Sequence, residues 1–223
     1  GYDTMSIQAT GNEEDARILL GARLASYRFD TYQTKLKDDQ KPSLENIILV
    51  SEAVDALSAS WEPLAAAAAG TELARDLMNE PPNVLYPASY AARIKDMESL
   101  GLKVTILGEK EMAELGMNSL LGVGQGSVRE SQMVCIEWNG GGDEAPLALV
   151  GKGVCFDSGG ISLKPGPNMH DMKGDMGGSA AVVGAMKTLA LRKAKANVVG
   201  LVGLVENMPD GNASRPGDIV TTM

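Results

Sequence analysis

Apolar and polar positions along the chain follow helical spacing in three long segments. In residues 13–36, apolar side chains recur at helical intervals, which predicts an amphipathic helix. Residues 51–79 are rich in Ala, Leu and Glu and predict a longer helix. The pair Pro81-Pro82 would end that helix, because proline lacks the N–H that a helix interior requires. Pro87 would then open another helix, since its fixed φ suits the first helical position.

Shorter apolar runs have the length and the β-branched content of buried strands. The predicted strands cover residues 46–51, 103–107, 133–138, 147–151 and 196–205, and further predicted helices cover 109–115 and 176–193. Strands that alternate with helices favour an α/β fold with crossover connections. We therefore predict a mixed, mostly parallel sheet flanked by helices.

The proline pair also marks the best internal boundary, because domain boundaries fall where few contacts cross the chain. We expect residues 1–52 to be the end of an N-terminal α/β domain and residues 53–80 to be a connector helix. Residues 81–223 would then form the first part of a second domain.

Composition and charge narrow the classes of partner. The formal net charge of −9 argues against nucleic acid, because binding to phosphates draws on clustered Lys and Arg. The same negative field disfavours an anionic membrane surface, and no run approaches the ~20 apolar residues of a membrane span. Cys135 and Cys155 lie in apolar runs without a CxxC partner. We expect two reduced core thiols, which fits a reducing cytosol.

Residues 151–175 concentrate the charged side chains that could carry chemistry. Lys152, Asp157, Lys164 and Asp175 follow one another where a buried-looking strand ends. Polar groups outside the carboxyl ends of strands are where α/β proteins place their sites. Each residue also has an ordinary structural explanation, because aspartates form turns and begin helices and most lysines are solvated surface charges.

A metal site in this chain would have to rest mainly on carboxylate oxygens. His170 is the single histidine and no paired cysteines exist, so a His- or Cys-based zinc site within the chain is excluded. Carboxylates suit Mg²⁺ or Mn²⁺, and zinc in a carboxylate-rich site is also possible. Lys152 lies in the apolar run LALVGKGVCF, where an unpaired ammonium is costly. It therefore has partners or is neutral, and a desolvated lysine beside metal ions can donate a lone pair.

A glycine run at residues 122–126 is a competing motif. Its sequence GVGQG has the spacing GxGxG, whereas the dinucleotide loop has GxGxxG. No clear strand precedes the run and no convincing helix follows it. A nucleotide-binding α/β domain is therefore an alternative that rests on this loop alone.

Two long segments resemble the leucyl aminopeptidases, also called cytosol aminopeptidase or, in bacteria, aminopeptidase A. They read VGKGVCFDSGGISLKPGPNMHDMKGDMGG at 150–178 and VVGLVGLVENMPDGNASRPGDIVTTM at 198–223. Upstream, ARDLMNEPPNVLYP at 74–87 and SYRFDTYQTK at 26–35 are also similar to the family. The resemblance spans nearly the whole chain in the expected order, and motifs of this length are highly specific.

The resemblance implies a role for each charged residue of the 151–175 segment. Lys152, Asp157 and Asp175 match positions that bind two divalent metal ions, manganese or zinc, with Asp157 bridging them. Lys164 matches the catalytic lysine that helps to polarise the scissile carbonyl. Met172 matches a residue that lines the pocket for the first side chain of the substrate.

The resemblance also implies an activity and an assembly. The activity is a metal-dependent aminopeptidase that releases leucine-like N-terminal residues from peptides, using a hydroxide activated by two metal ions. Members of the family are cytoplasmic homohexamers with a catalytic C-terminal domain, of which residues 81–223 would be the first part. The alternative is a non-catalytic relative, or the DNA-binding role of some bacterial relatives.

A second essential motif of the family, NTDAEGR, is absent from this sequence and is expected shortly after Met223. It contributes two further carboxylate ligands and an arginine. We therefore expect a fragment that is truncated at both ends, binds metal weakly and has little or no activity alone.

Overall fold

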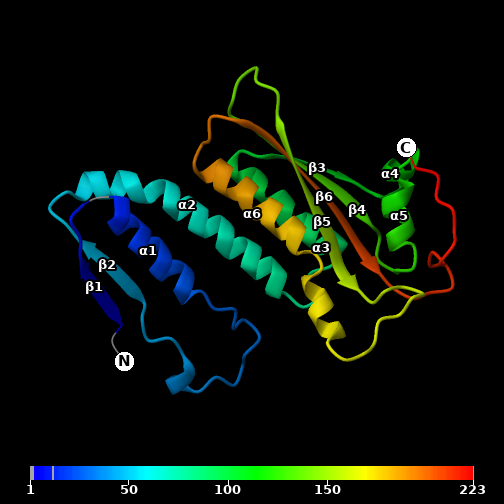
Figure 1. Cartoon of the computed structure of the whole chain (residues 1–223), viewed down its shortest axis with the longest axis horizontal. Helices are drawn as coiled ribbons and strands as arrows, with labels where there is room; N and C mark the ends of the chain where they lie inside the picture. Colours follow the sequence, from blue (N-terminus) through cyan, green and yellow to red (C-terminus); the bar gives the residue numbers. More distant parts are fainter. Residues whose placement is uncertain (1–2, 12, 223) are drawn as a thin grey trace.

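Two sheets joined by one long helix organise the chain in the computed structural model, which describes residues 3–11 and 13–222 (Figure 1). A parallel two-stranded sheet is formed by β1 (Thr4–Gln8) and β2 (Asn46–Val50). A four-stranded sheet has the order β3 (Lys103–Leu107), β4 (Gln132–Asn139), β6 (Asn197–Asn207) and β5 (Leu147–Asp157).

Helices connect and cover these strands. The α-helices are α1 (Glu13–Ser26), α2 (Val54–Asn79), α3 (Pro87–Lys95), α4 (Glu109–Glu114), α5 (Asn118–Gly124) and α6 (Gly177–Leu191). The described residues also form the short 3₁₀ helices η1 (Asp38–Gln40), η2 (Asp96–Leu100) and η3 (Met169–Gly174). No helix in the described part of the chain is both long enough and apolar enough to span a membrane.

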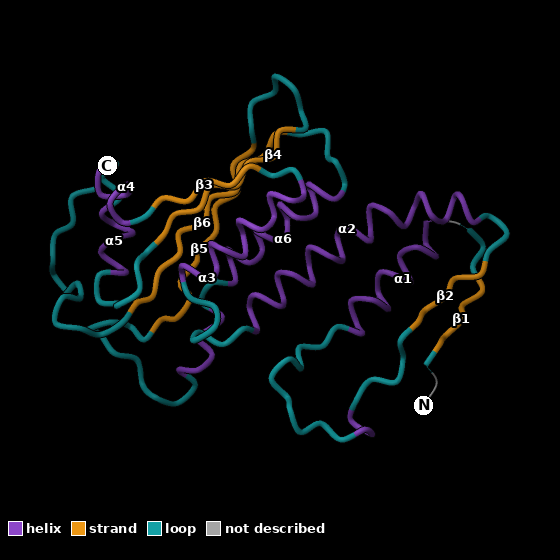
Figure 2. The backbone as a smooth tube through the Cα atoms, turned by 180° about the vertical axis from the view of Figure 1, so that it is seen from behind, coloured by secondary structure: helices purple, strands orange, loops and turns teal. Residues whose placement is uncertain are grey.

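The long helix α2 packs against a different hydrophobic cluster at each end. Near its start, Leu57 joins Ala9 and Ala16 in a small cluster beside the two-stranded sheet. Near its end, Leu77 belongs to the main core of the four-stranded sheet. At a rise of about 1.5 Å per residue, such a helix extends over roughly 39 Å, which lets it join the two units. Figure 2 shows α2 running between them, alongside α6.

The contact between α2 and α6 is unusually close because glycines occupy it. A Cβ atom at Gly70 of α2 would overlap with Thr188 Oγ1 and with the Gly184 carbonyl oxygen, both in α6. Thr188 Oγ1 in turn donates hydrogen bonds to the carbonyl oxygens of Gly184, at 3.0 Å, and Ala66, at 3.3 Å. The two helices therefore meet backbone to backbone, with little side-chain volume between them.

Helices cover both faces of the four-stranded sheet at β6, one of its two inner strands. A Cβ at Gly200 would approach Met186 of α6 to 3.0 Å, and one at Gly203 would approach Leu120 of α5 to 2.6 Å. Positions 200 and 203 differ in parity, so these contacts lie on opposite faces of the strand. The core on the α6 side includes the fully buried side chains of Tyr90 and Met176. This two-sided burial explains why β6 is an almost uninterrupted run of Val, Leu and Gly.

The structure confirms the mixed α/β fold and the predicted strands and long helix, with two corrections. The four-stranded sheet is not mostly parallel, because β5 pairs with β6 in parallel whereas β3–β4 and β4–β6 are antiparallel.

The helix predicted at 13–36 ends at Ser26. Arg75 of α2 donates a hydrogen bond to the Leu24 carbonyl at 2.7 Å. Beyond Ser26, the Tyr27 hydroxyl donates to Asp76 and the Tyr32 hydroxyl donates to Glu80. Because Asp76 and Glu80 lie at the end of α2, the chain after Ser26 follows that helix. The proposed boundaries after residues 52 and 80 stay a prediction.

Exchanging Gly70 for alanine tests the close contact between α2 and α6. The added Cβ would overlap with atoms of Thr188 and Gly184, so the two helices would have to move apart. We expect Gly70→Ala to lower the free energy of unfolding by about 1–3 kcal/mol, measured by urea denaturation.

Gly21→Ala is the matched control, because a Cβ at Gly21 in α1 meets no described atom within 4 Å. Alanine is also favoured over glycine in a helix by about 1 kcal/mol, so this variant should be at least as stable as the wild type. Equal unfolding free energies for the two variants would contradict the packing of α2 on α6.

Candidate functional site

The candidate site lies at the carboxyl ends of the parallel strands β5 and β6, where α/β proteins place their ligands. Val154 pairs with Val205, but the next pair is Phe156 with Glu206, so one extra residue of β5 forms a β-bulge. A bulge re-aims the side chains that follow it. As a result Asp157, the last residue of β5, stands opposite Asn207, the last residue of β6.

The Asp157 carboxylate accepts hydrogen bonds on both oxygens. Lys164 Nζ donates to Oδ2, while the Gly159 N–H and Asn207 Nδ2 donate to Oδ1 at 2.9 and 2.8 Å. Burial raises the pKa of the Asp157 carboxyl, but these hydrogen bonds outweigh burial and hold the pKa below its ordinary value. The side chain is therefore an ionised carboxylate at neutral pH.

A tight turn after β5 brings Lys164 back to Asp157. Gly159 and Gly160 have φ of 93° and 63°, a left-handed backbone that favours glycine. The Lys164 N–H donates to the Ser158 carbonyl at 2.9 Å, which closes the turn. The lysine side chain can then contact an aspartate seven positions before it.

Lys152 and Asp175 form a second ion pair, with Nζ and Oδ1 2.7 Å apart. Asp175 lies between η3 and α6, and the backbone of α6 begins against β5, where a Cβ at Gly151 would come within 2.7 Å of the Gly178 carbonyl. The Lys152 side chain is 59% exposed, so it is not desolvated. It does have a charged partner, Asp175, which is one of the two possibilities that its apolar sequence context predicts.

Asp175 Oδ2 is buried and has no hydrogen-bond partner among the residues that the structure describes. A buried carboxylate oxygen without a donor costs free energy, so such an atom normally has a cation or a donor beside it. No group of three or more His, Cys, Asp or Glu side chains gathers to hold a metal within the described ranges. Asp157 and Asp175 are the predicted ligands that present carboxylate oxygens beside β5.

The other sequence-predicted residues lie at or away from this site. Met172 is a half-buried residue of η3, three positions before Asp175. The His170 side chain, in η3, is 79% exposed to solvent. In the glycine run, Gly122 and Gly124 lie within α5, and a Cβ at Gly124 would overlap with Ser131. That run is explained by helix packing, which weakens the nucleotide-loop interpretation.

Sequence reasoning missed Asn207, which bonds Asp157 from the neighbouring strand. The only available signal was that both residues follow long apolar runs, because residues at the ends of adjacent parallel strands meet at one edge. The pairing itself depends on the strand order and on the bulge, neither of which the sequence pattern fixes.

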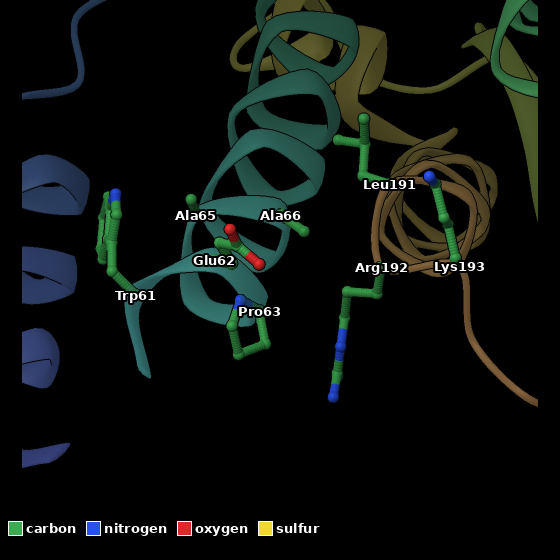
Figure 3. Close-up of a pocket in the computed structure, with 8 residues that line it drawn as sticks. All are labelled: Trp61, Glu62, Pro63, Ala65, Ala66, Leu191, Arg192 and Lys193. Atoms are coloured by element: carbon green, nitrogen blue, oxygen red, sulfur yellow. The ribbon is translucent and has the colours of Figure 1, made fainter. Parts of the chain in front are cut away.

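One cleft borders the candidate site and another lies away from it. A cavity of about 510 Å³ borders the candidate site and is lined in part by Gly160, Asn207 and Val220. Another, of about 740 Å³, is lined by residues near the start of α2, among them Glu62 and Ala66, and by Leu191 at the end of α6 (Figure 3). Because α6 begins two residues after Asp175 and its 15 residues extend over roughly 22 Å, this second cleft lies far from the charged pairs.

Comparisons with known proteins show the family to which the chain belongs. A model of the cytosol aminopeptidase family, catalytic domain, matches residues 72–223. The probable cytosol aminopeptidase of Caulobacter vibrioides is 60% identical over 214 residues, which are 95% of this chain and 43% of that protein. The corresponding protein of Rhizobium etli is 54% identical over 224 residues, covering 97% of this chain and 45% of its own length.

The chain is also similar to solved structures over nearly its whole length. The bottromycin maturation enzyme BotP in complex with Mn has a TM-score of 0.85 and 37% identity, covering 99% of this chain and 48% of that one. Cytosol aminopeptidase from Coxiella burnetii has a TM-score of 0.83 and 30% identity, covering 97% and 46%.

The chain is thus an α/β protein whose candidate site lies where two parallel strands, β5 and β6, end. More particularly, the chain belongs to the cytosol aminopeptidase family. It spans less than half the length of the curated relatives that it matches.

The two thiols should differ in reactivity, because they differ in burial. Both are free, and burial raises the pKa of Cys155 to about 12 and also raises that of the partly exposed Cys135. We expect iodoacetamide at pH 8 to alkylate Cys155 only after unfolding, and Cys135 faster in the native protein, as read by mass spectrometry. Equal labelling of both cysteines in the native protein would contradict the buried position of Cys155.

Proposed function

We propose that the whole protein containing this chain is a metal-dependent aminopeptidase that releases leucine-like N-terminal residues from peptides. The observation that supports the proposal is the presence of two lysine–aspartate ion pairs along β5: Lys164 with Asp157, the last residue of the strand, and Lys152, in the middle of the strand, with Asp175. Membership in a family whose relatives are named cytosol aminopeptidases supports a peptide hydrolase.

The donor set suits divalent cations such as Mn²⁺ or Zn²⁺. Asp157 is ionised, and Asp175 offers a buried oxygen that lacks a donor within the described residues. The Lys152 nitrogen, which lies 2.7 Å from Asp175 Oδ1, would be a further ligand, as the family resemblance implies. One solved relative, BotP, is described as a complex with Mn. A pair of such cations, when bound, supplies Lewis acidity and lowers the pKa of water.

The chain's own residues would orient the substrate and stabilise charge. The Lys164 ammonium projects from the turn after β5 to the Asp157 carboxylate, so it would lie beside any carbonyl held there. A cation in that position stabilises negative charge as it develops on the carbonyl oxygen. Met172, from η3, would line the pocket for the first side chain of the peptide, as the family resemblance implies.

The proposal includes a cytoplasmic homohexamer that acts on peptides, since the family resemblance implies this assembly and location. A role on nucleic acid is disfavoured by the net charge of −9. A non-catalytic relative is disfavoured because both lysines and both aspartates of the site are present and paired.

Removing the Lys164 side chain in the whole protein tests its catalytic role. We expect Lys164→Ala to lower the turnover of leucine p-nitroanilide by about 10²–10³-fold, because one charge-stabilising donor is lost. Bound manganese, measured by inductively coupled plasma mass spectrometry, should change far less. Lys110→Ala is the control, because Lys110 is an exposed lysine of α4. Unchanged turnover in Lys164→Ala would remove the assigned role.

Residues 1–223 expressed alone should bind Mn²⁺ weakly and show little or no activity. Their described part gathers no three acidic, His or Cys side chains around a common point, so too few ligands surround a cation. Isothermal titration with Mn²⁺ and hydrolysis of leucine p-nitroanilide, each run beside the whole protein, are the measurements. Hydrolysis by the 223-residue chain at the rate of the whole protein would contradict the expectation.

A further inference from the structure

The two oxygens of the Asp157 carboxylate have different surroundings. Oδ1 accepts two hydrogen bonds, from the Gly159 N–H at 2.9 Å and from Asn207 Nδ2 at 2.8 Å. Oδ2 accepts one described hydrogen bond, from the movable end of the Lys164 side chain. The carboxylate is therefore anchored through Oδ1 and leaves Oδ2 as the oxygen that can accept a further partner.

The two anchors come from different parts of the fold. Gly159 belongs to the turn that directly follows Asp157, so its N–H moves together with that carboxylate. Asn207 is the end of the neighbouring strand β6 and stands in register with Asp157. The hydrogen bond from the Asn207 amide therefore fixes the Asp157 carboxylate relative to the sheet. The two residues are 50 positions apart in the sequence.

Asn207 is itself held on more than one side. Its backbone carbonyl accepts the Ser158 N–H at 3.0 Å and the Ser158 hydroxyl at 2.7 Å. Its Oδ1 lies 2.6 Å from the place where a Cβ of Gly160 would stand, so a larger residue at 160 would displace the amide. The side chain is therefore confined between the turn and the strand that it joins.

We propose that Asn207 is a positioning residue that turns the Asp157 carboxylate so that Oδ2 faces a divalent cation. This inference rests on the proposed function, because it takes Asp157 to be a metal ligand. An amide suits the task because Nδ2 donates without bringing a charge. An aspartate at 207 would instead place a second carboxylate against Oδ1. Groups that orient a ligand in this way typically contribute about 10- to 100-fold to metal affinity.

The test uses the whole protein stripped of metal. The Mn²⁺ dissociation constant is measured by competition with a fluorescent chelator, and the melting temperature of the metal-free protein is measured in parallel. Asn207→Ala removes the donor, and Asn207→Leu removes it while keeping a branched side chain of similar shape. Both variants should bind Mn²⁺ about 10- to 100-fold more weakly than the wild type.

Two further variants separate the possible causes of a change. Asn139→Ala exchanges an exposed asparagine at the opposite end of the sheet, because β4 runs antiparallel to β6 and pairs Asn139 with Asn197. It should keep the wild-type dissociation constant. Asp157→Ala tests the proposed function itself, because it removes the ligand that Asn207 orients.

The outcomes distinguish the inference from the function on which it rests. Weaker Mn²⁺ binding by Asp157→Ala, with wild-type binding by both Asn207 variants, overturns the positioning role and leaves the proposed function intact. Wild-type binding by Asp157→Ala overturns the proposed function. A lower melting temperature with an unchanged dissociation constant, or loss of the fold in both Asn207 variants, would show that Asn207 only supports the structure and would overturn the inference.

Discussion

The parallel pairing of β5 with β6 is the interaction on which the site depends. It brings the last residues of two strands, Asp157 and Asn207, side by side, and the bulge after Val154 sets which residues meet. Without that extra residue, the register would shift by one and the alternate side chain would face Asn207. The hydrogen bonds of Asp157 with Lys164 and Gly159 then build on a carboxylate that the sheet has already placed.

The second half of the site depends on how α6 is seated. Asp175 comes two residues before this helix, and Gly151 and Gly178 let the start of α6 approach β5 closely. Along its length α6 is pressed against α2 through glycine at position 70. Packing at one helix interface thus holds the aspartate that pairs with Lys152, and it connects the stability of the fold to the geometry of the site.

Much of the fold could be predicted from the sequence, because periodicity marks buried strands. Long motifs single out the four charged residues, whose roles stay a prediction. The direction of the strands could not be predicted, because an apolar run has the same pattern in a parallel and in an antiparallel pair. The four-stranded sheet contains more antiparallel pairing than predicted. The end of α1 depends on Arg75, 51 positions beyond the carbonyl that it binds. Asn207 escaped notice for the same reason, because its role arises only when two distant strands pair.

The central claim is that Asp157 and Asp175, each beside its lysine, hold divalent cations. Anomalous scattering from crystals of the whole protein soaked in MnCl₂ tests it most directly. We predict manganese peaks within bonding distance of Asp157 Oδ2 and of Asp175 Oδ2. Manganese bound elsewhere, with the Lys152 amine turned away from both carboxylates, would contradict it.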